Sequence, residues 1–181
     1  GSDILLTTAG LLTRNPVLND QRGVPFTRRN GTVDRGAFER QSLFVVDTLI
    51  DESDGDSSSG DFSLREAIEL ANSNVGGDKI AFAPGLTGTI TLNPTLGPLL
   101  ISDHVDIIGP GAAVLTISGN NTASRLLLIE DSTANMINVN ISGLTFRDAG
   151  DGIMNISGGA INSAESLTLT NVAFISNEVG S

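Results

Sequence analysis

Cysteine, tryptophan and tyrosine are absent from the 181 residues, and aromatic residues amount to only 4%. Without cysteine there is no disulfide framework and no thiolate metal site. No apolar run approaches the roughly 20 residues that a membrane-spanning helix needs. Lysine occurs once and the net charge is −11, which argues against nucleic acid as a partner, because nucleic-acid-binding proteins present a basic face.

The apolar residues that are present are mainly leucine, isoleucine and valine, within a hydrophobic fraction of 39%. Threonine, serine, asparagine and 21 glycines fill most of the other positions. β-Branched side chains pack well on pleated strands, while glycine and asparagine accept the left-handed backbone of tight corners. The composition therefore predicts an all-β protein of short strands joined by tight turns.

Three copies of one short pattern occupy the second half of the chain. In each copy a strand of alternating apolar residues ends in Gly109, Gly143 or Asn171, and a second alternating strand follows. Glycine and asparagine tolerate the left-handed conformation, so we expect the same tight corner in each copy. The aligned segments are 105–109 with 115–117, 139–143 with 144–146, and 167–171 with 172–174.

A repeat of short strands without helical periodicity predicts a right-handed parallel β-helix, also called a β-solenoid. In such a coil the inward Leu, Ile, Val and Phe side chains stack in ladders along the axis. A β-sandwich is the alternative, because its short strands also alternate. We favour the β-helix, since sandwich strands need not share a register of corner residues.

One helix is predicted upstream of the repeats. Ser63 and Glu66 form a capping box, which marks a helix start. The apolar residues that follow fall on one helical face. They are Leu64, Ala67, Ile68 and Ala71. We expect this helix, from Ser63 to Asn72, to be an N-terminal capping α-helix that covers the open first coil, whose unpaired strand edge would otherwise invite aggregation.

The same region carries a family resemblance. The sequence FSLREAI at 62–68, followed by Asn72 and by DKIAF at 78–82, resembles the signature that opens the CSLREA domain. Phe62 stands where that family has cysteine. The phenylalanine keeps an apolar side chain at this position but cannot carry out thiol chemistry. The resemblance implies a large bacterial protein of the choice-of-anchor type, secreted or at the cell surface, with parallel β-helix repeats.

The N-terminal segment differs from the rest in charge and in resemblance. Six arginines and four acidic residues give residues 1–40 a net charge of +2. The net charge of the whole chain is −11, so residues 41–181 carry −13. Residues 20–23 and 31–39 resemble the closing signature of β-helix domains, with Arg35 in place of the usual aliphatic residue. We therefore expect residues 1–40 to resemble the end of a preceding β-helix domain, within a longer tandem-repeat chain.

We expect residues 41–181 to hold the N-terminal cap and the first coils. The cap combines a strand at Leu43–Val46, an acidic loop at Asp47–Asp61 and the helix.

Closely spaced carboxylates make the acidic loop the best candidate for a cation site. Asp51, Asp54 and Asp56 lie among serines and glycines, and calcium takes six to eight oxygen ligands. The spacing does not match an EF-hand, because no glutamate follows at the closing position. The candidate ligands for calcium are thus Asp51, Asp54 and Asp56, and the alternative is a solvated linker without a metal.

Two further groups are candidates for catalysis. His104 is the only histidine and lies between Asp103 and Asp106, but the aligned positions of the next copy hold Asn138 and Asn140, which are poor acid–base groups. Arg147, Asp148 and Asp151 form the other charged cluster on the coils, and an exposed ion pair is its simpler interpretation. We predict no catalytic residues and no bound cofactor other than calcium.

The sequence therefore favours a non-catalytic structural or adhesive module of a secreted or cell-surface repeat protein. Its surface, rich in serine, threonine and asparagine, suits glycans or neighbouring surface proteins as partners. One alternative is a carbohydrate-active enzyme on a β-helix, either a polysaccharide lyase or a glycosidase. The other is a calcium-dependent binding module.

Overall fold

The computed structural model describes residues 4–6, 12–14, 41–74, 76–123, 125–133, 136–150 and 159–178. The chain divides into two compact units, Gly1–Glu39 and Arg40–Ser181. In the first unit β1 (Ile4–Leu6) pairs antiparallel with β2 (Leu12–Arg14). The second resemblance, at 20–23 and 31–39, lies outside the described residues.

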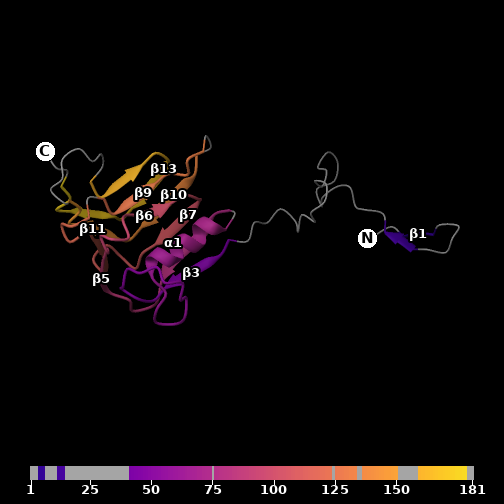
Figure 1. The fold of residues 1–181 in the computed structure, drawn as a ribbon, viewed down its shortest axis with the longest axis horizontal. Helices are drawn as coiled ribbons and strands as arrows, with labels where there is room; N and C mark the ends of the chain where they lie inside the picture. The colour runs from indigo at the N-terminus through magenta and orange to yellow at the C-terminus, as the bar shows by residue number, and fades with distance from the viewer. Residues whose placement is uncertain are drawn as a thin grey trace. The chain divides into compact units, whose positions relative to one another are not determined.

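In the second unit the strands form three parallel sheets, which we number one to three (Figure 1). Sheet one has the order β13 (Ser166–Thr170), β10 (Asn138–Ser142), β7 (Val105–Ile108), β4 (Asp78–Phe82), β3 (Leu43–Val46). Sheet two has the order β14 (Ala173–Ile175), β11 (Thr145–Arg147), β8 (Leu115–Ser118), β5 (Gly88–Thr91). Sheet three has the order β12 (Ile161–Ser163), β9 (Leu127–Ile129), β6 (Leu99–Ile101).

From β4 onward the chain visits sheets one, two and three in strict rotation. Neighbours within a sheet are therefore separated along the chain by one strand from each of the other two sheets. Every pairing in this unit is parallel. Among the described residues, the second unit is accordingly built of parallel strands together with one α-helix.

The strand register confirms the alignment of the three sequence copies. Val139 of β10 pairs with Val105 on one side and with Leu167 on the other. In the second strand of each copy, Thr145 pairs in the same way with Thr116 and Ala173. Residues that were aligned by their pattern alone thus lie directly beside one another in space.

The predicted corners are confirmed at two of the three positions. Gly143 and Asn171 have φ values of +64° and +52°, in the left-handed region. The prediction is wrong for Gly109, which has no positive φ. Glycine is required there for a different reason, because a Cβ at Gly109 would overlap the carbonyl oxygen of Gly143 and the side chain of Leu144.

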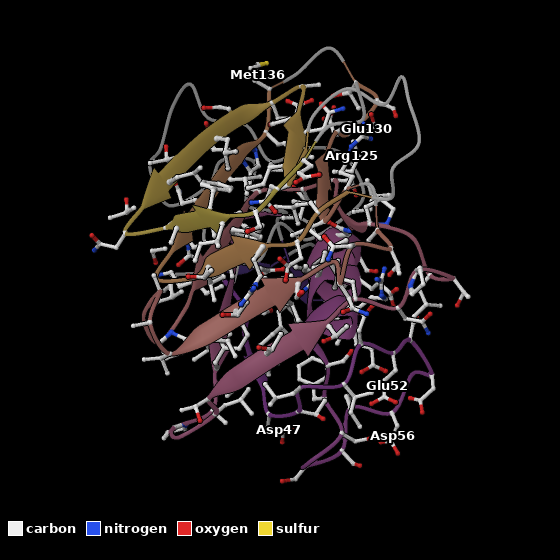
Figure 2. All side chains as sticks on the ribbon, turned by 90° about the vertical axis from the view of Figure 1, so that its left-hand side faces the viewer. Asp47, Glu52, Asp56, Arg125, Glu130 and Met136 are labelled. Carbon is white, nitrogen blue, oxygen red and sulfur yellow. The ribbon has the colours of Figure 1, made fainter. Side chains whose placement is uncertain are left out.

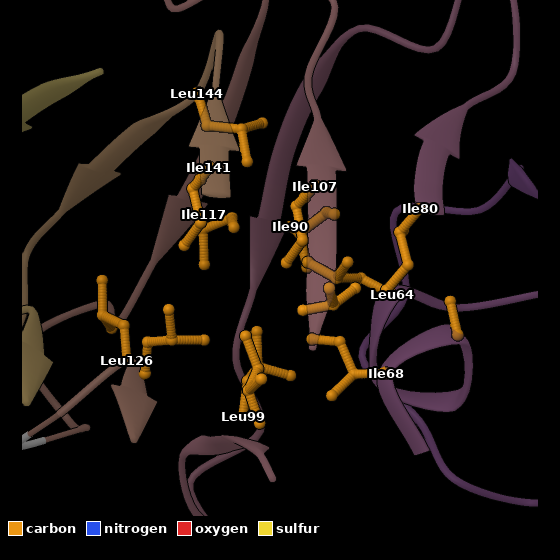
Figure 3. Close-up of a cluster of buried hydrophobic side chains, with 14 of the residues drawn as sticks. Leu64, Ile68, Ile80, Ile90, Leu99, Ile107, Ile117, Leu126, Ile141 and Leu144 are labelled. Atoms are coloured by element: carbon orange, nitrogen blue, oxygen red, sulfur yellow. The ribbon is translucent and has the colours of Figure 1, made fainter. Parts of the chain in front are cut away.

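Inward-facing apolar side chains stack in columns along each sheet and form a single core (Figure 3). The period of two along each strand places every second residue on this inner face. Each such side chain contributes about 1.5–3 kcal/mol when it is fully buried. The columns are Ile80–Ile107–Ile141 in sheet one, Ile90–Ile117–Phe146 in sheet two and Leu99–Leu127 in sheet three.

The predicted helix is present as α1 (Leu64–Ser73), with the predicted capping box. The Glu66 N–H donates to Ser63 Oγ at 3.2 Å, and the Ser63 N–H donates to Glu66 Oε2 at 3.0 Å. The predicted apolar face is buried throughout, and α1 packs against β3, β4 and β6. Figure 3 shows Leu64 beside Ile80, so the helix meets the column of sheet one at its first turn.

The apolar face of α1 gives a direct test of how much the helix contributes to the fold. Ile68 is 2% exposed, so Ile68→Asp should lower the free energy of unfolding by at least about 3 kcal/mol, because it buries an unpaired charge. Leu70 is 42% exposed on the same helix, and Leu70→Asp should cost less than about 1 kcal/mol. Urea unfolding measures both, and equal losses would contradict the packing described here.

Candidate functional site

Arg65 lies on the packed side of α1, where a charged side chain is uncommon. Its Nε and Nη2 atoms donate to Oδ1 and Oδ2 of Asp51 at 2.8 and 2.9 Å, which makes a bidentate ion pair. The side chains are only 7% and 1% exposed, respectively. Because both charges have been removed from water, each depends on the other for compensation.

The same ion pair also holds the loop between β5 and β6. Arg65 Nη2 donates to the Gly97 carbonyl at 2.9 Å, and Nη1 donates to the Pro98 carbonyl at 3.2 Å. Asp51 Oδ2 also accepts the Asn93 N–H at 2.7 Å. The carboxylate that we predicted as a calcium ligand is therefore engaged by a guanidinium and a backbone amide.

The other two predicted calcium ligands, Asp54 and Asp56, are exposed on the loop before α1. They accept the backbone N–H of Asp56 at 2.8 Å and of Ser58 at 2.9 Å, as short polar side chains do in turns. Within the described ranges, no group of three or more His, Cys, Asp or Glu side chains is placed to hold a metal ion. Asp51, Asp54 and Asp56 are thus not brought together, and calcium binding by the loop stays a prediction.

Carboxylates crowd at this end of the unit, where Figure 2 shows Asp47, Glu52 and Asp56 near one another. Partial burial raises the pKa of Glu52, and the carboxylates of Asp61 and Asp54 raise it further. Partial burial together with Asp54 and Asp56 likewise raises the pKa of Asp61. Glu52 Oε1 is buried without a hydrogen-bond partner, so ionisation of Glu52 destabilises the folded state.

Glu66 stays ionised in the same surroundings because hydrogen bonds compensate its charge. Burial alone would raise its pKa, but donation from Ser63 and from the Gly55 N–H at 3.0 Å outweighs burial and lowers the pKa. Glu66 therefore joins the acidic loop to the start of α1.

A polar hollow of about 210 Å³ lies at the first residues of β4, β7 and β10. His104 Nδ1 accepts the Asn138 N–H at 2.8 Å, and the Asn140 side-chain amide donates to Asp106 Oδ1 at 2.7 Å. The candidate residues His104 and Asp106 thus lie beside the asparagines of the next copy, as their alignment predicts. The polar side chains that line the hollow are Gln41, Asp78, His104, Asp106, Asn138 and Asn140.

Asp78 is a residue of this hollow that the sequence analysis missed. It occupies an inward position of β4, in register with Val105, and is only 2% exposed. Oδ1 accepts the Ser42 N–H at 2.8 Å, while Oδ2 is buried without a hydrogen-bond partner. The sequence feature that could have identified Asp78 is its alignment with apolar residues, because the later strands have Val105, Val139 and Leu167 at the same position.

The second charged cluster considered from the sequence is an exposed ion pair. Arg147 Nε donates to Asp148 Oδ2 at 2.7 Å, and the Arg147 side chain is 46% exposed. Asp151 lies outside the described residues. Pairing between chain neighbours at this exposure contributes little to stability, and it leaves neither group free as a base.

No protein-family model, curated protein or solved structure matches this chain. Among the described residues, no helix is both long and apolar enough to cross a bilayer.

Removing the charge of Arg65 should test the buried ion pair. Arg65→Met leaves Asp51 buried and unpaired, so the free energy of unfolding should fall by about 3–5 kcal/mol in urea titrations. Adding Asp51→Leu to that variant should recover part of the loss, because the uncompensated charge disappears. Full stability of Arg65→Met would show that the pair is dispensable.

The pKa of Glu52 gives a prediction for pH dependence. Its pKa is raised above the ordinary value of 4.5, so the folded state retains a proton that the unfolded state releases, and stability falls as pH rises through this interval. Glu52→Gln should therefore raise the melting temperature at pH 7, and the gain should vanish below about pH 4, where both states are protonated. Glu130→Gln, which changes an exposed carboxylate, is the control.

Melting of the parent with calcium chloride tests the predicted metal site in the same assay. Calcium held by Asp54 and Asp56 should raise the melting temperature of the parent at pH 7, and Asp54→Asn should remove that rise. No response of the parent to millimolar calcium would leave the solvated loop as the correct interpretation.

Proposed function

We propose that this chain is the capped first part of a right-handed parallel β-helix, and that it serves as a non-catalytic structural or adhesive module of a secreted or cell-surface bacterial repeat protein. The rotation of the chain through three parallel sheets supports the coil, because each set of three strands then completes one turn. Parallel connections are right-handed in nearly all proteins, which supports the hand.

The helix supports the assignment of a capped beginning. It lies against β3, β4 and β6, the first strands of sheets one and three. The residues of the FSLREAI sequence have structural roles at this place: Phe62 is buried, Ser63 and Glu66 cap the helix, and Arg65 pairs with Asp51. A motif whose polar members are engaged in this way favours a folding role over a catalytic one.

The last turn carries the central observation. Ile141 and Phe146 are each 1% exposed, but the residues that continue their columns, Leu169 and Phe174, are 39% and 49% exposed. The Phe174 ring stacks on Phe146 with its centroid 5.7 Å away, so the column continues outward and ends uncovered. β12, β13 and β14 are also the outermost strands of their sheets within the described residues.

We take the occupant of this face to be a further parallel turn of the same repeat. Such a turn would pair with the free edges of β13 and β14 and would bury Leu169 and Phe174 in the columns that they continue. A compact ligand would cover the side chains and leave the strand edges unpaired. Coils added in this way build a stalk, and its outer face presents the serine, threonine and asparagine side chains to glycans or neighbouring proteins.

The open end predicts unequal effects of one substitution at equivalent positions. Phe146→Asp should lower the free energy of unfolding by at least about 3 kcal/mol, whereas Phe174→Asp should lower it by less than about 1 kcal/mol. Phe174→Asp should also abolish any concentration-dependent self-association of the parent in sedimentation velocity, because it places a charge on the apolar end. Equal losses of stability at both positions would contradict an open last turn.

Catalysis is the competing function, with the hollow at His104 as its best site. We expect the parent not to cleave polygalacturonate, alginate or chondroitin, with or without calcium, in assays for reducing ends and unsaturated products. Asp78, His104 and Asp106 are drawn from only two turns and have asparagines as their neighbours in the third. Turnover that is lost in His104→Gln or Asp106→Asn would overturn the structural role in favour of an enzyme.

A further inference from the structure

The outer edge of β6 is bonded by side chains of α1 instead of by a strand. β6 is the outermost strand of sheet three within the described residues, and α1 packs beside it. Leu99 and Ile101 turn their main-chain hydrogen-bonding groups towards β9. Alternate residues of a parallel strand face opposite neighbours, so Pro98, Leu100 and Ser102 turn theirs to the outer edge.

The side-chain amide of Asn72 makes two hydrogen bonds to this edge. Its Nδ2 atom donates to the Leu100 carbonyl at 2.7 Å, and its Oδ1 atom accepts the Ser102 N–H at 2.8 Å. A residue of a neighbouring parallel strand bonds in the same way, to one carbonyl and to the N–H two residues later. The carboxamide of Asn72 therefore takes the place of one residue of a neighbouring strand.

Arg65 extends the same contact towards the start of β6. It lies seven positions before Asn72, so the two side chains leave the same side of α1 two turns apart. Arg65 Nη1 donates to the Pro98 carbonyl at 3.2 Å, and proline offers no N–H to a further strand. The first turn of α1 thus meets the start of β6 and the last turn meets its end, so the helix runs along the edge in the direction of the strand.

The position of α1 in the chain agrees with its position beside β6. From β4 onward, one strand of sheet two and one of sheet three separate successive strands of sheet one. Between β3 and β4 the helix stands in their place. A free strand edge is a template for pairing with another chain, and here that edge is bonded by a helix that cannot continue the sheet.

We propose that Asn72 acts as a one-residue substitute for a parallel strand, and that α1 thereby closes the edge of sheet three to strands of other molecules. The inference rests on the proposed function, in which a further turn joins the last strands. The columns are uncovered at Leu169 and Phe174, whereas the edge of β6 is closed. This difference directs a further turn to one end of the unit and gives the stalk a direction of growth.

Hydrogen exchange of the Ser102 amide, measured by NMR on the full chain, tests the role of Asn72. Asn72→Ala removes both hydrogen bonds and should speed this exchange about tenfold. Asn72→Asp keeps an acceptor for the Ser102 N–H and should change the exchange by less than about twofold. Asn74→Ala is the matched control, because Asn74 also lies at the end of α1 but its amide donates to Ser42 Oγ at 3.2 Å.

Sedimentation velocity over a series of concentrations tests whether Asn72 closes the edge to other molecules. Every variant also carries Phe174→Asp, which keeps the uncovered end from contributing to association. Asn72→Ala should then cause self-association, because the β6 edge becomes free to pair. Asn72→Asp also loses the bond to Leu100 but should stay monomeric, because a charge at a strand edge opposes pairing. Asn74→Ala should sediment as the Phe174→Asp background does.

A variant that fails to fold does not end the test. Asn72→Gln takes the place of Asn72→Ala in both measurements if urea unfolding shows that the alanine variant is not folded. The longer side chain of glutamine does not reach the Leu100 carbonyl and the Ser102 N–H with the same geometry, so faster exchange and self-association are again expected.

Three results would overturn the proposal. The first is unchanged exchange of the Ser102 amide in Asn72→Ala. The second is faster exchange without self-association above the Phe174→Asp background, which would leave Asn72 as a stabilising contact of the helix. The third is equal association in Asn72→Ala and Asn74→Ala. Failure of the proposed open end is distinguishable, because Phe174→Asp by itself would then lose as much stability as Phe146→Asp.

Discussion

A single guanidinium joins the parts of the chain that begin this fold. Arg65 donates to both oxygens of Asp51 and to the carbonyls of Gly97 and Pro98, so the segment before the helix, the helix and the loop before β6 meet at one buried charge. Lysine would not replace it, because only the planar fork reaches a carboxylate and a loop at once. The packing of α1 on β3, β4 and β6 therefore depends on a polar contact as much as on the apolar face of the helix.

Beyond the helix the structure is governed by the need for each set of three strands to match the next. Each strand of the second unit pairs in parallel with equivalent strands, so a side chain on the inner face must fit a column and a corner must fit the corner beside it. Gly109 illustrates the second requirement, because its backbone is close to the carbonyl of Gly143 and the side chain of Leu144. The columns of isoleucine and phenylalanine illustrate the first, and they end uncovered at Leu169 and Phe174.

The two surfaces with functional consequences have different origins. The uncovered end of the columns follows from the repeated pattern, because each set of three strands presents the same edges and the same inner face to the next. The hollow at His104 follows from a departure from the repeat: Gly77 supplies no side chain, and Asp78 places a carboxylate where later turns have Val105 and Val139.

Local pattern by itself determined the helix, its capping box and its buried face, because these depend on residues within one or two turns of one another. It also determined which residues of the three copies are equivalent, because each copy contains the same period-two alternation and a glycine or asparagine at the corner. Pattern did not reveal that Asp51 pairs with Arg65, that Gly109 is required for space, or that Asp78 and Gly77 line a hollow with His104. Those outcomes were decided by the tertiary structure, because each depends on atoms that packing brings together from segments about 15–40 residues apart in the chain.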